Sequence, residues 1–242
     1  MAKDRKRRFT AEYRERAKAK DGRDVLFRLL RPDDKAGLLD GLRRMSAQSR
    51  YTRFFTPRDS LNPTELAYLT EIDQERHFAI AVGLVEGGED MNVGLGVGRF
   101  VCDEDDPKSA EAAVAVVDEA QGLGLGKMLF ERLTAAARER GIEEFHLDIL
   151  PENAAMLGLL QRLFPTAESY PDSDVVYVKC PLPAAPHTTE FPFFRVLSEA
   201  AQGTLRVMRA FRAWPLPDNL VDGLLEDSPD SERLVQEKDE WK

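Results

Sequence analysis

The sequence predicts a mixed α/β fold of the α+β kind, in which helices flank one mostly antiparallel sheet. Three observations carry this prediction. Residues 112–117 form an almost continuous apolar run, which is typical of a buried central strand. A glycine-rich turn at residues 121–126 follows the run and leads into residues 126–140, where apolar side chains recur with helical period. Elsewhere, strand-like and helix-like segments succeed one another from residue 25 to residue 180, as in a single mixed domain.

The first quarter of the chain predicts an arm, one strand and three helices. Residues 1–22 are strongly basic, and we expect them to form a flexible arm. The apolar segment at residues 25–30 predicts a strand, which must end before Pro32 because proline forces the preceding residue out of helical space. Three helical segments are expected next, beginning near Asp34, Ser46 and Asn62.

The middle of the chain predicts strands with two helices between them. Strands are expected at residues 77–82, 91–102, 111–117, 145–150 and 175–180. Helices are expected at residues 126–140, which Gly141 terminates, and at residues 154–164. The domain should therefore span residues 23–182.

The last part of the chain, residues 183–242, predicts an extension with one helix, at about residues 196–213, and an acidic tail. This helix is expected to pack on the main domain or on a second subunit, so a homodimer is one of the expected arrangements.

Composition excludes several classes of protein. No apolar run approaches the roughly 20 residues that a membrane helix needs. Cys102 and Cys180 are the only cysteines and lie far apart, which predicts neither a disulfide framework nor a metal site and fits a cytoplasmic protein. The basic arm alone does not lead us to expect nucleic acid as a partner, although steep salt dependence of binding would reveal one.

The glycine-rich turn predicts a phosphate-binding loop. A strand, a glycine turn and a helix N-terminus together offer close backbone approach, convergent N–H groups and a partial positive charge. A nucleoside-triphosphate loop would need Ser or Thr after Lys127, where the chain has Met128. A dinucleotide loop would need a third glycine where Lys127 stands.

The spacing Gln121-x-x-Gly124-x-Gly126 resembles the Q/R-x-x-G-x-G/A motif of the GCN5-related N-acetyltransferases, or GNAT family. The resemblance covers residues 26–182 and implies the GNAT fold, with a sheet of six to seven strands. It also implies that acetyl-CoA binds here, its pantetheine arm along the strand and its pyrophosphate on the loop. The residues implicated are Val116 and Val117 for the arm, and Gln121, Gly122, Leu123, Gly124, Leu125, Gly126 and Lys127 for the loop.

A second segment extends the resemblance. Asn153 follows the predicted strand at residues 145–150, where the family has an asparagine that contacts the cofactor; as a helix cap it would serve equally well. Seven residues later many relatives carry a tyrosine as general acid, but this chain has Leu160. No general acid is therefore assigned.

Glu111 is the predicted general base, because an amine must lose a proton when it attacks a thioester. The pattern Ala110-Glu111-x-Ala113 resembles a subset of bacterial protein-lysine acetyltransferases in which a glutamate here acts as base. We expect burial to raise its pKa toward neutrality. Secondary candidates are Glu75, His77 and Asp118.

A further motif, Ser46-x-x-Ser49-Arg50-Tyr51-x-Arg53-Phe54-Phe55, resembles the early helices of the same subset, which form one wall of the acceptor site. Arg50 and Arg53 are candidates for orienting an acidic acceptor or the cofactor. The two phenylalanines are expected to fill the core.

The sequence thus predicts an enzyme that moves an acetyl group from acetyl-CoA to a primary amine, by direct attack in a ternary complex, with a protein lysine slightly preferred as acceptor. Two alternatives stay open. One is acetylation of a small-molecule amine. The other is a catalytically weak module that binds acyl-CoA for regulation, which would be consistent with Leu160.

Overall fold

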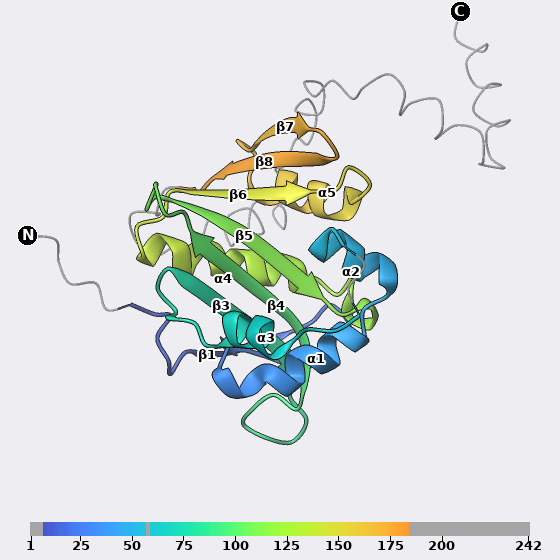
Figure 1. Ribbon diagram of the computed structural model, residues 1–242. Helices are drawn as coiled ribbons and strands as arrows, with labels where there is room; N and C mark the ends of the chain where they lie inside the picture. The colour runs from blue at the N-terminus through green and yellow to red at the C-terminus, as the bar shows by residue number, and fades with distance from the viewer. Residues whose placement is uncertain (1–6, 57–58, 184–242) are drawn as a thin grey trace, which may run out of the picture. The chain divides into compact units, whose positions relative to one another are not determined.

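A single eight-stranded sheet organises the part of the chain that the computed structural model describes, residues 7–56 and 59–183 (Figure 1). Its strands lie in the order β1-β2-β3-β4-β5-β6-β8-β7. They are β1 (Arg14–Lys18), β2 (Asp24–Leu29), β3 (His77–Leu84), β4 (Val93–Cys102), β5 (Ser109–Val116), β6 (Glu144–Ile149), β7 (Glu168–Asp172) and β8 (Val175–Pro181). All neighbours pair antiparallel except β5 and β6, which are parallel.

Helices cover both faces of the sheet. Within the described residues they are α1 (Lys35–Arg43), α2 (Ala47–Phe54), α3 (Pro63–Thr70), α4 (Leu125–Glu139) and α5 (Ala154–Leu163), with 3-10 turns at Pro32–Asp34 and Asp118–Ala120. Figure 1 shows α1 and α3 in front of β3 and β4, with α4 behind the sheet. The connection from β5 to α4 therefore crosses from the sheet to its rear face.

The main core lies between the sheet and α4. Phe78 and Phe100 stack with ring centroids 5.1 Å apart, and Phe145 continues the aromatic row across β6. α4 approaches β4 so closely that a Cβ atom on Gly98 would lie 2.9 Å from Leu133 Cδ1. A glycine is needed at this position because backbone and helix side chains are already in contact. The tight packing holds α4 close against β4.

Most of the predicted elements are confirmed. The predicted strands and the five predicted helices of the domain all form, within a few residues of the expected bounds. Gly141 ends α4 with φ of +81°, the left-handed conformation expected of a terminating glycine. The mixed, mostly antiparallel sheet is confirmed as well, with eight strands in place of six to seven.

The two additional strands lie at the edges of the sheet. The prediction of a flexible arm at residues 1–22 is wrong for its second half, because β1 pairs with β2, and Phe9 and Tyr13 are buried in the core. β7 carries Pro171 and is mostly exposed, so it has no apolar alternation that could reveal a strand. Edge strands of this kind bury little side-chain surface, which weakens their pattern.

The predicted C-terminal extension, including the helix at about residues 196–213, lies outside the described residues from residue 184 onward. None of the helices in the described part of the chain has the length and apolarity that a membrane span requires.

Candidate active site

A cleft opens where the parallel strands β5 and β6 separate. The two strands pair only at Ser109, Ala110 and Glu111, opposite residues 144–146. Beyond Glu111, β5 continues to Val116 on its β4 side, and β6 continues to Ile149 on its β8 side. Their facing edges are thus left unpaired, which creates a cleft of about 690 Å³ between them. A sheet opened in this way exposes backbone N–H and C=O groups that an extended ligand can bind.

The glycine loop closes one end of this cleft. Gly122 and Gly124 have φ of +74° and +85°, and Gly124 is the residue from which α4 starts. The first N–H groups of a helix have no partner within it and carry partial positive charge. At this helix they belong to the residues after Gly124, several of which line the cleft. The predicted order of strand, glycine turn and helix is confirmed, and phosphate binding at this turn stays a prediction.

Lys20 adds a cation that sequence analysis missed. It lies between β1 and β2, its N–H donates to the carbonyl of Leu123 at 3.1 Å, and its side chain runs past Gly124 into the cleft. Lys127, on the first turn of α4, also lines the cleft and forms an ion pair with Glu131 at 3.0 Å. Glycine amides, a helix N-terminus and lysine ammonium groups are a donor set that fits a pyrophosphate.

Most of the predicted binding residues line the cleft. They are Glu111, Val116, Gln121, Gly122, Gly124, Leu125, Gly126, Lys127 and Asn153. Leu123 does not, because its side chain packs on the core.

Val117 points away from the cleft, so its predicted contact with the pantetheine arm needs correction. It is buried, and its side chain faces Gly41 of α1 on the other side of the strand. Its N–H donates to Leu95 and its carbonyl accepts from Ala120, both at 3.0 Å. With both backbone groups used, Val117 has nothing to offer an extended ligand.

Asn153 and Leu160 mark the start and the interior of α5. The side-chain oxygen of Asn153 accepts from Met156 N at 3.1 Å, so the residue does cap the helix, and it also faces the cleft. Leu160 is 1% exposed and belongs to the core. It lies away from the cleft, and no proton donor takes the place of a tyrosine at this position.

The motif at Ser46 ties α2 to the glycine loop. Ser46 caps α2, and its backbone N–H donates to Asp118 Oδ2 at 3.0 Å. Gln121 Nε2 donates to Ser49 Oγ at 3.2 Å and to Asp118 Oδ1 at 3.3 Å. From the sequence, the motif that contains Ser46 and Ser49 was expected only to form a wall of the acceptor site. In the structure, these two serines also hold the glycine loop in position.

We expect Asp118→Ala to lower the free energy of unfolding by about 1–2 kcal/mol, since it removes the acceptor that joins Ser46 to the loop. Urea unfolding measures the change. Asp105→Ala, on an exposed turn between β4 and β5, is the matched control and should stay within about 0.5 kcal/mol of the parent. Equal effects of the two variants would show that the link carries no stability.

Glu111 lies at the point where β5 and β6 part, and its side chain is exposed. The prediction that this carboxyl group is buried is therefore wrong, because the separation of the strands opens its surroundings to solvent. The group still lies in the cleft and close to Arg53. Burial lowers the pKa of Arg53, and the negative charge of Glu111 partly offsets that decrease.

The secondary candidates lie elsewhere. Glu75 pairs with Arg7 at 2.5 Å, and Asp118 holds the loop. His77 Nε2 is 3.1 Å from a nitrogen of Arg99, and its ring is 5.1 Å from that of Tyr68. None of the three lines the cleft.

Burial, together with the charge of Arg99, lowers the pKa of His77 to about 4. We therefore expect its imidazole signals to titrate near pH 4 in an NMR titration. Because an unfolded histidine titrates near 6.5, the unfolded chain takes up this proton first as the pH falls. His77 thus contributes stability above about pH 6.5 that is lost toward pH 4. His77→Gln should flatten the stability profile in that window, and a midpoint above 6 would contradict the assignment.

Comparison with known proteins finds acetyltransferases by sequence and by structure. A family model described as the acetyltransferase (GNAT) family matches residues 44–164. Acetyltransferase PA5475 of Pseudomonas aeruginosa is 32% identical over 152 residues, covering 63% of this chain and 80% of that protein. Acetyltransferase Pat of Mycolicibacterium smegmatis is 32% identical over 134 residues, covering 54% of this chain but only 38% of Pat. The crystal structure of the GNAT domain of S. lividans PAT superposes with a TM-score of 0.64 at 25% identity, covering 72% of this chain and 99% of that domain.

Proposed function

The chain belongs to the GNAT family of acetyltransferases, and from this premise we propose that it transfers the acetyl group of acetyl-CoA, bound in the β5–β6 cleft, to a primary amine. It is an acetyl-CoA-dependent acyltransferase by its family. The observation that carries the proposed site is the meeting of three features at one cleft. These are the unpaired edges of β5 and β6, the left-handed glycines at the start of α4, and Lys20 from the β1–β2 turn.

Each part of the cleft has a proposed task. The amides that follow Gly122 and Gly124 bind the pyrophosphate, with Lys20 and Lys127 neutralising its charge. The edge of β5 at Val116 and the cap of α5 at Asn153 line the path of the pantetheine arm. Bound in this way, acetyl-CoA supplies an activated acetyl thioester.

Glu111 is proposed to accept the proton of the attacking amine, which makes the nitrogen lone pair available. Its exposed carboxylate stands at the end of the β5–β6 pairing, where the cleft meets solvent. No cysteine of the described residues lines the cleft: Cys180 is buried, and Cys102 lies on the far part of β4. This supports direct attack by the amine, with no acetylated cysteine on the way.

We favour a protein lysine as the acceptor, with a small-molecule amine as the alternative. Support comes from the two sequence motifs around Ser46 and Glu111, and from the exposure of Glu111, which a protruding lysine side chain can reach.

The test is calorimetric titration of the full chain with acetyl-CoA, followed by measurement of free coenzyme A released in the presence of amine acceptors. We expect saturable binding with one site and acceptor-dependent release. Absence of binding would overturn the assignment of the cleft. Binding without release on any amine would favour a regulatory acyl-CoA-binding module.

A further inference from the structure

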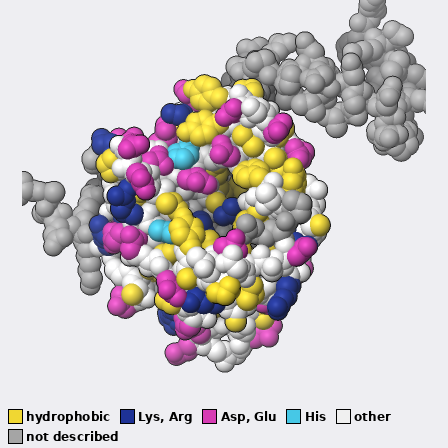
Figure 2. Space-filling view, in the orientation of Figure 1, with side chains coloured by type: hydrophobic (Ala, Val, Ile, Leu, Met, Phe, Trp, Pro, Cys, Tyr) yellow, Lys and Arg dark blue, Asp and Glu magenta, His cyan; other side chains and the backbone are white. Residues whose placement is uncertain are grey.

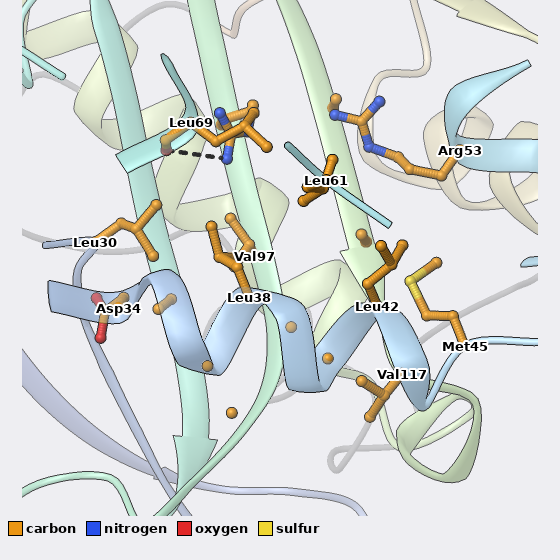
Figure 3. Close-up of a pocket in the computed structure, with 18 of the residues that line it drawn as sticks. Leu30, Asp34, Leu38, Leu42, Met45, Arg53, Leu61, Leu69, Val97 and Val117 are labelled. Atoms are coloured by element: carbon orange, nitrogen blue, oxygen red, sulfur yellow. Dashed lines mark hydrogen bonds between the residues drawn. The ribbon is translucent and has the colours of Figure 1, made fainter. Parts of the chain in front are cut away.

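A second cavity lies on the front face of the sheet, beneath α1 and α3. It has a volume of about 230 Å³ and an apolar lining to which α1 contributes Leu38 and Leu42 (Figure 3). Met45, Arg53, Ala113 and Ala115 line both this cavity and the proposed acetyl-CoA cleft. The two spaces therefore adjoin at β5, next to the proposed base.

Three arginines line this largely apolar cavity: Arg28, which is paired with Asp34, and Arg53 and Arg99. Arg99 projects from the middle of β4, is 8% exposed, and stands between Ala79 and Ala113 of the neighbouring strands. Arg53 enters from α2 on the opposite side, as Figure 3 shows. The space-filling view shows this face hollowed near its centre, with Lys or Arg side chains at the bottom and hydrophobic side chains around them (Figure 2).

Arg99 has no anionic partner within residues 7–56 and 59–183. Its guanidinium contacts His77 Nε2 at 3.1 Å and the carbonyl oxygen of Leu69 at 3.4 Å, the latter drawn as a dashed line in Figure 3. His77 is neutral at physiological pH, since its pKa is about 4. Burial and the charge of Arg53 together lower the pKa of Arg99 to about 10.

Arg53 forms no ion pair with any residue that the structure describes, and its neighbour on the same helix shows the contrast. Arg50 donates to the carbonyl of Met45 and to Asp59, both at 2.8 Å, and so serves the structure. Among the described residues, Arg53 has neither a hydrogen bond nor an ion pair, and it only contacts the ring of Phe54. The exposed carboxylate of Glu111 acts on Arg53 through its charge, without a hydrogen bond or an ion pair.

Two cations held together in a largely apolar cavity are costly, because each loses hydration and they repel one another. Buried charges are normally paired or used for binding. The nearby arginine Arg28, by comparison, is paired with Asp34 through two 2.7 Å hydrogen bonds. Asp34, which also lines the cavity, is engaged by Arg28, so an anion bound between Arg53 and Arg99 would offset the charge of these two arginines.

We propose that Arg53 and Arg99 bind a carboxylate of the acceptor, so that the substrate class is an amine accompanied by a carboxylate. This inference rests on the proposed function. Arg99 pairs across the sheet with Ala113, which is two residues, or about 7 Å of backbone, along β5 from Glu111. A carboxylate four or five bonds from the reactive nitrogen spans that separation. It can belong to a free ω-amino acid. An acidic residue beside a protein lysine is many more bonds away, and it reaches the same position when its side chain folds back toward the lysine nitrogen.

The test compares acceptors that differ only in charge. The free-acid arm uses 5-aminovalerate against 5-aminovaleramide, and the peptide arm uses acetyl-Asp-Lys-amide against acetyl-Asn-Lys-amide. The measured quantity is kcat/KM for release of coenzyme A by the full chain with acetyl-CoA. We expect at least a tenfold preference for the carboxylate member in one arm, and the arm that shows it identifies the source of the carboxylate.

Arg53→Gln and Arg99→Gln should each lower kcat/KM for the carboxylate acceptor at least tenfold more than for its neutral counterpart, mainly through KM. Arg43→Gln, which removes an exposed arginine from α1, should keep the preference for the carboxylate acceptor. If Arg99→Gln unfolds, as circular dichroism will reveal, Arg53→Gln and the charge-conserving Arg99→Lys carry the test.

The inference would be overturned if kcat/KM were equal for the charged and the neutral acceptor of each pair. It would also be overturned if Arg53→Gln lowered kcat/KM equally for the charged and the neutral acceptor. Either result would leave the acetyltransferase assignment intact. No turnover on either carboxylate acceptor would also overturn the inference. Calorimetry with acetyl-CoA then tells whether the proposed function fails as well.

Discussion

Gly124→Asp is expected to weaken acetyl-CoA binding by at least about 100-fold, equivalent to about 2.7 kcal/mol. Gly124 has φ of +85° at the start of α4, and a Cβ atom there would lie 3.4 Å from Lys20 Cε. An added carboxylate would also pair with Lys20 and repel the pyrophosphate from the helix N-terminus. Aspartate tolerates a positive φ better than most residues, so the domain should still fold. Calorimetric titration with acetyl-CoA measures the loss.

Gly141→Asp is the matched control for this variant. Gly141 has φ of +81° at the other end of α4, and nothing lies within 4 Å of the Cβ position. The Gly141→Asp variant therefore imposes a similar backbone strain without reaching the cleft. The affinity of this variant for acetyl-CoA should equal that of the parent protein. Unchanged affinity in Gly124→Asp would refute the placement of the pyrophosphate on this loop.

Glu111→Gln is expected to reduce kcat by at least about 100-fold, the usual contribution of a general base, with acetyl-CoA binding retained. Glutamine keeps the size of the side chain but cannot take a proton from the amine. Because Glu111 is exposed and forms no ion pair with the described residues, the fold should be unaffected. Release of coenzyme A with a saturating amine, measured beside a calorimetric titration, separates catalysis from binding.

Glu144→Gln serves as its control, since Glu144 opens the parallel partner strand β6 and pairs with Lys179 at 3.6 Å outside the cleft. We expect its kcat to match the parent within about twofold, since a loosely paired surface charge contributes little. Full activity of the Glu111→Gln variant would show that Glu111 is not the general base. A parent protein that binds acetyl-CoA but acetylates no amine would favour the regulatory acyl-CoA-binding alternative.

Local sequence chemistry was enough to predict most of the scaffold. The helix beginning at Asn62 follows from a capping asparagine and a proline in the first turn, and both of the capping hydrogen bonds form. The loop at residues 121–126 follows from glycine spacing between an apolar run and an amphipathic helix. Such signals are contained within a few residues, so they can be interpreted without knowing what lies nearby in space.

Features that depend on distant contacts were missed or misjudged. β1 is basic and looked like an arm, but pairing with β2 makes it an edge strand and delivers Lys20 to the glycine loop. Of the two valines predicted to contact the pantetheine arm, Val116 lines the cleft and Val117 does not, because successive residues of an extended chain point to opposite faces. Both backbone groups of Val117 are also hydrogen-bonded. Glu111 was expected to be buried, but the point at which two strands separate is a property of the whole sheet.

The sequence by itself determined the family resemblance, the order of elements, the position of the glycine loop and the residue proposed as base. Only the tertiary structure decided which residues share a space. It separated Arg50, which is paired with Asp59, from Arg53, which forms no ion pair within the described part of the chain, and it brought Arg53 of α2 to the same cavity as Arg99 of β4. The physical reason is that hydrogen-bond patterns and helical period are set by neighbours in the chain. Charge pairing and burial are set by neighbours in space, which a single sequence does not specify.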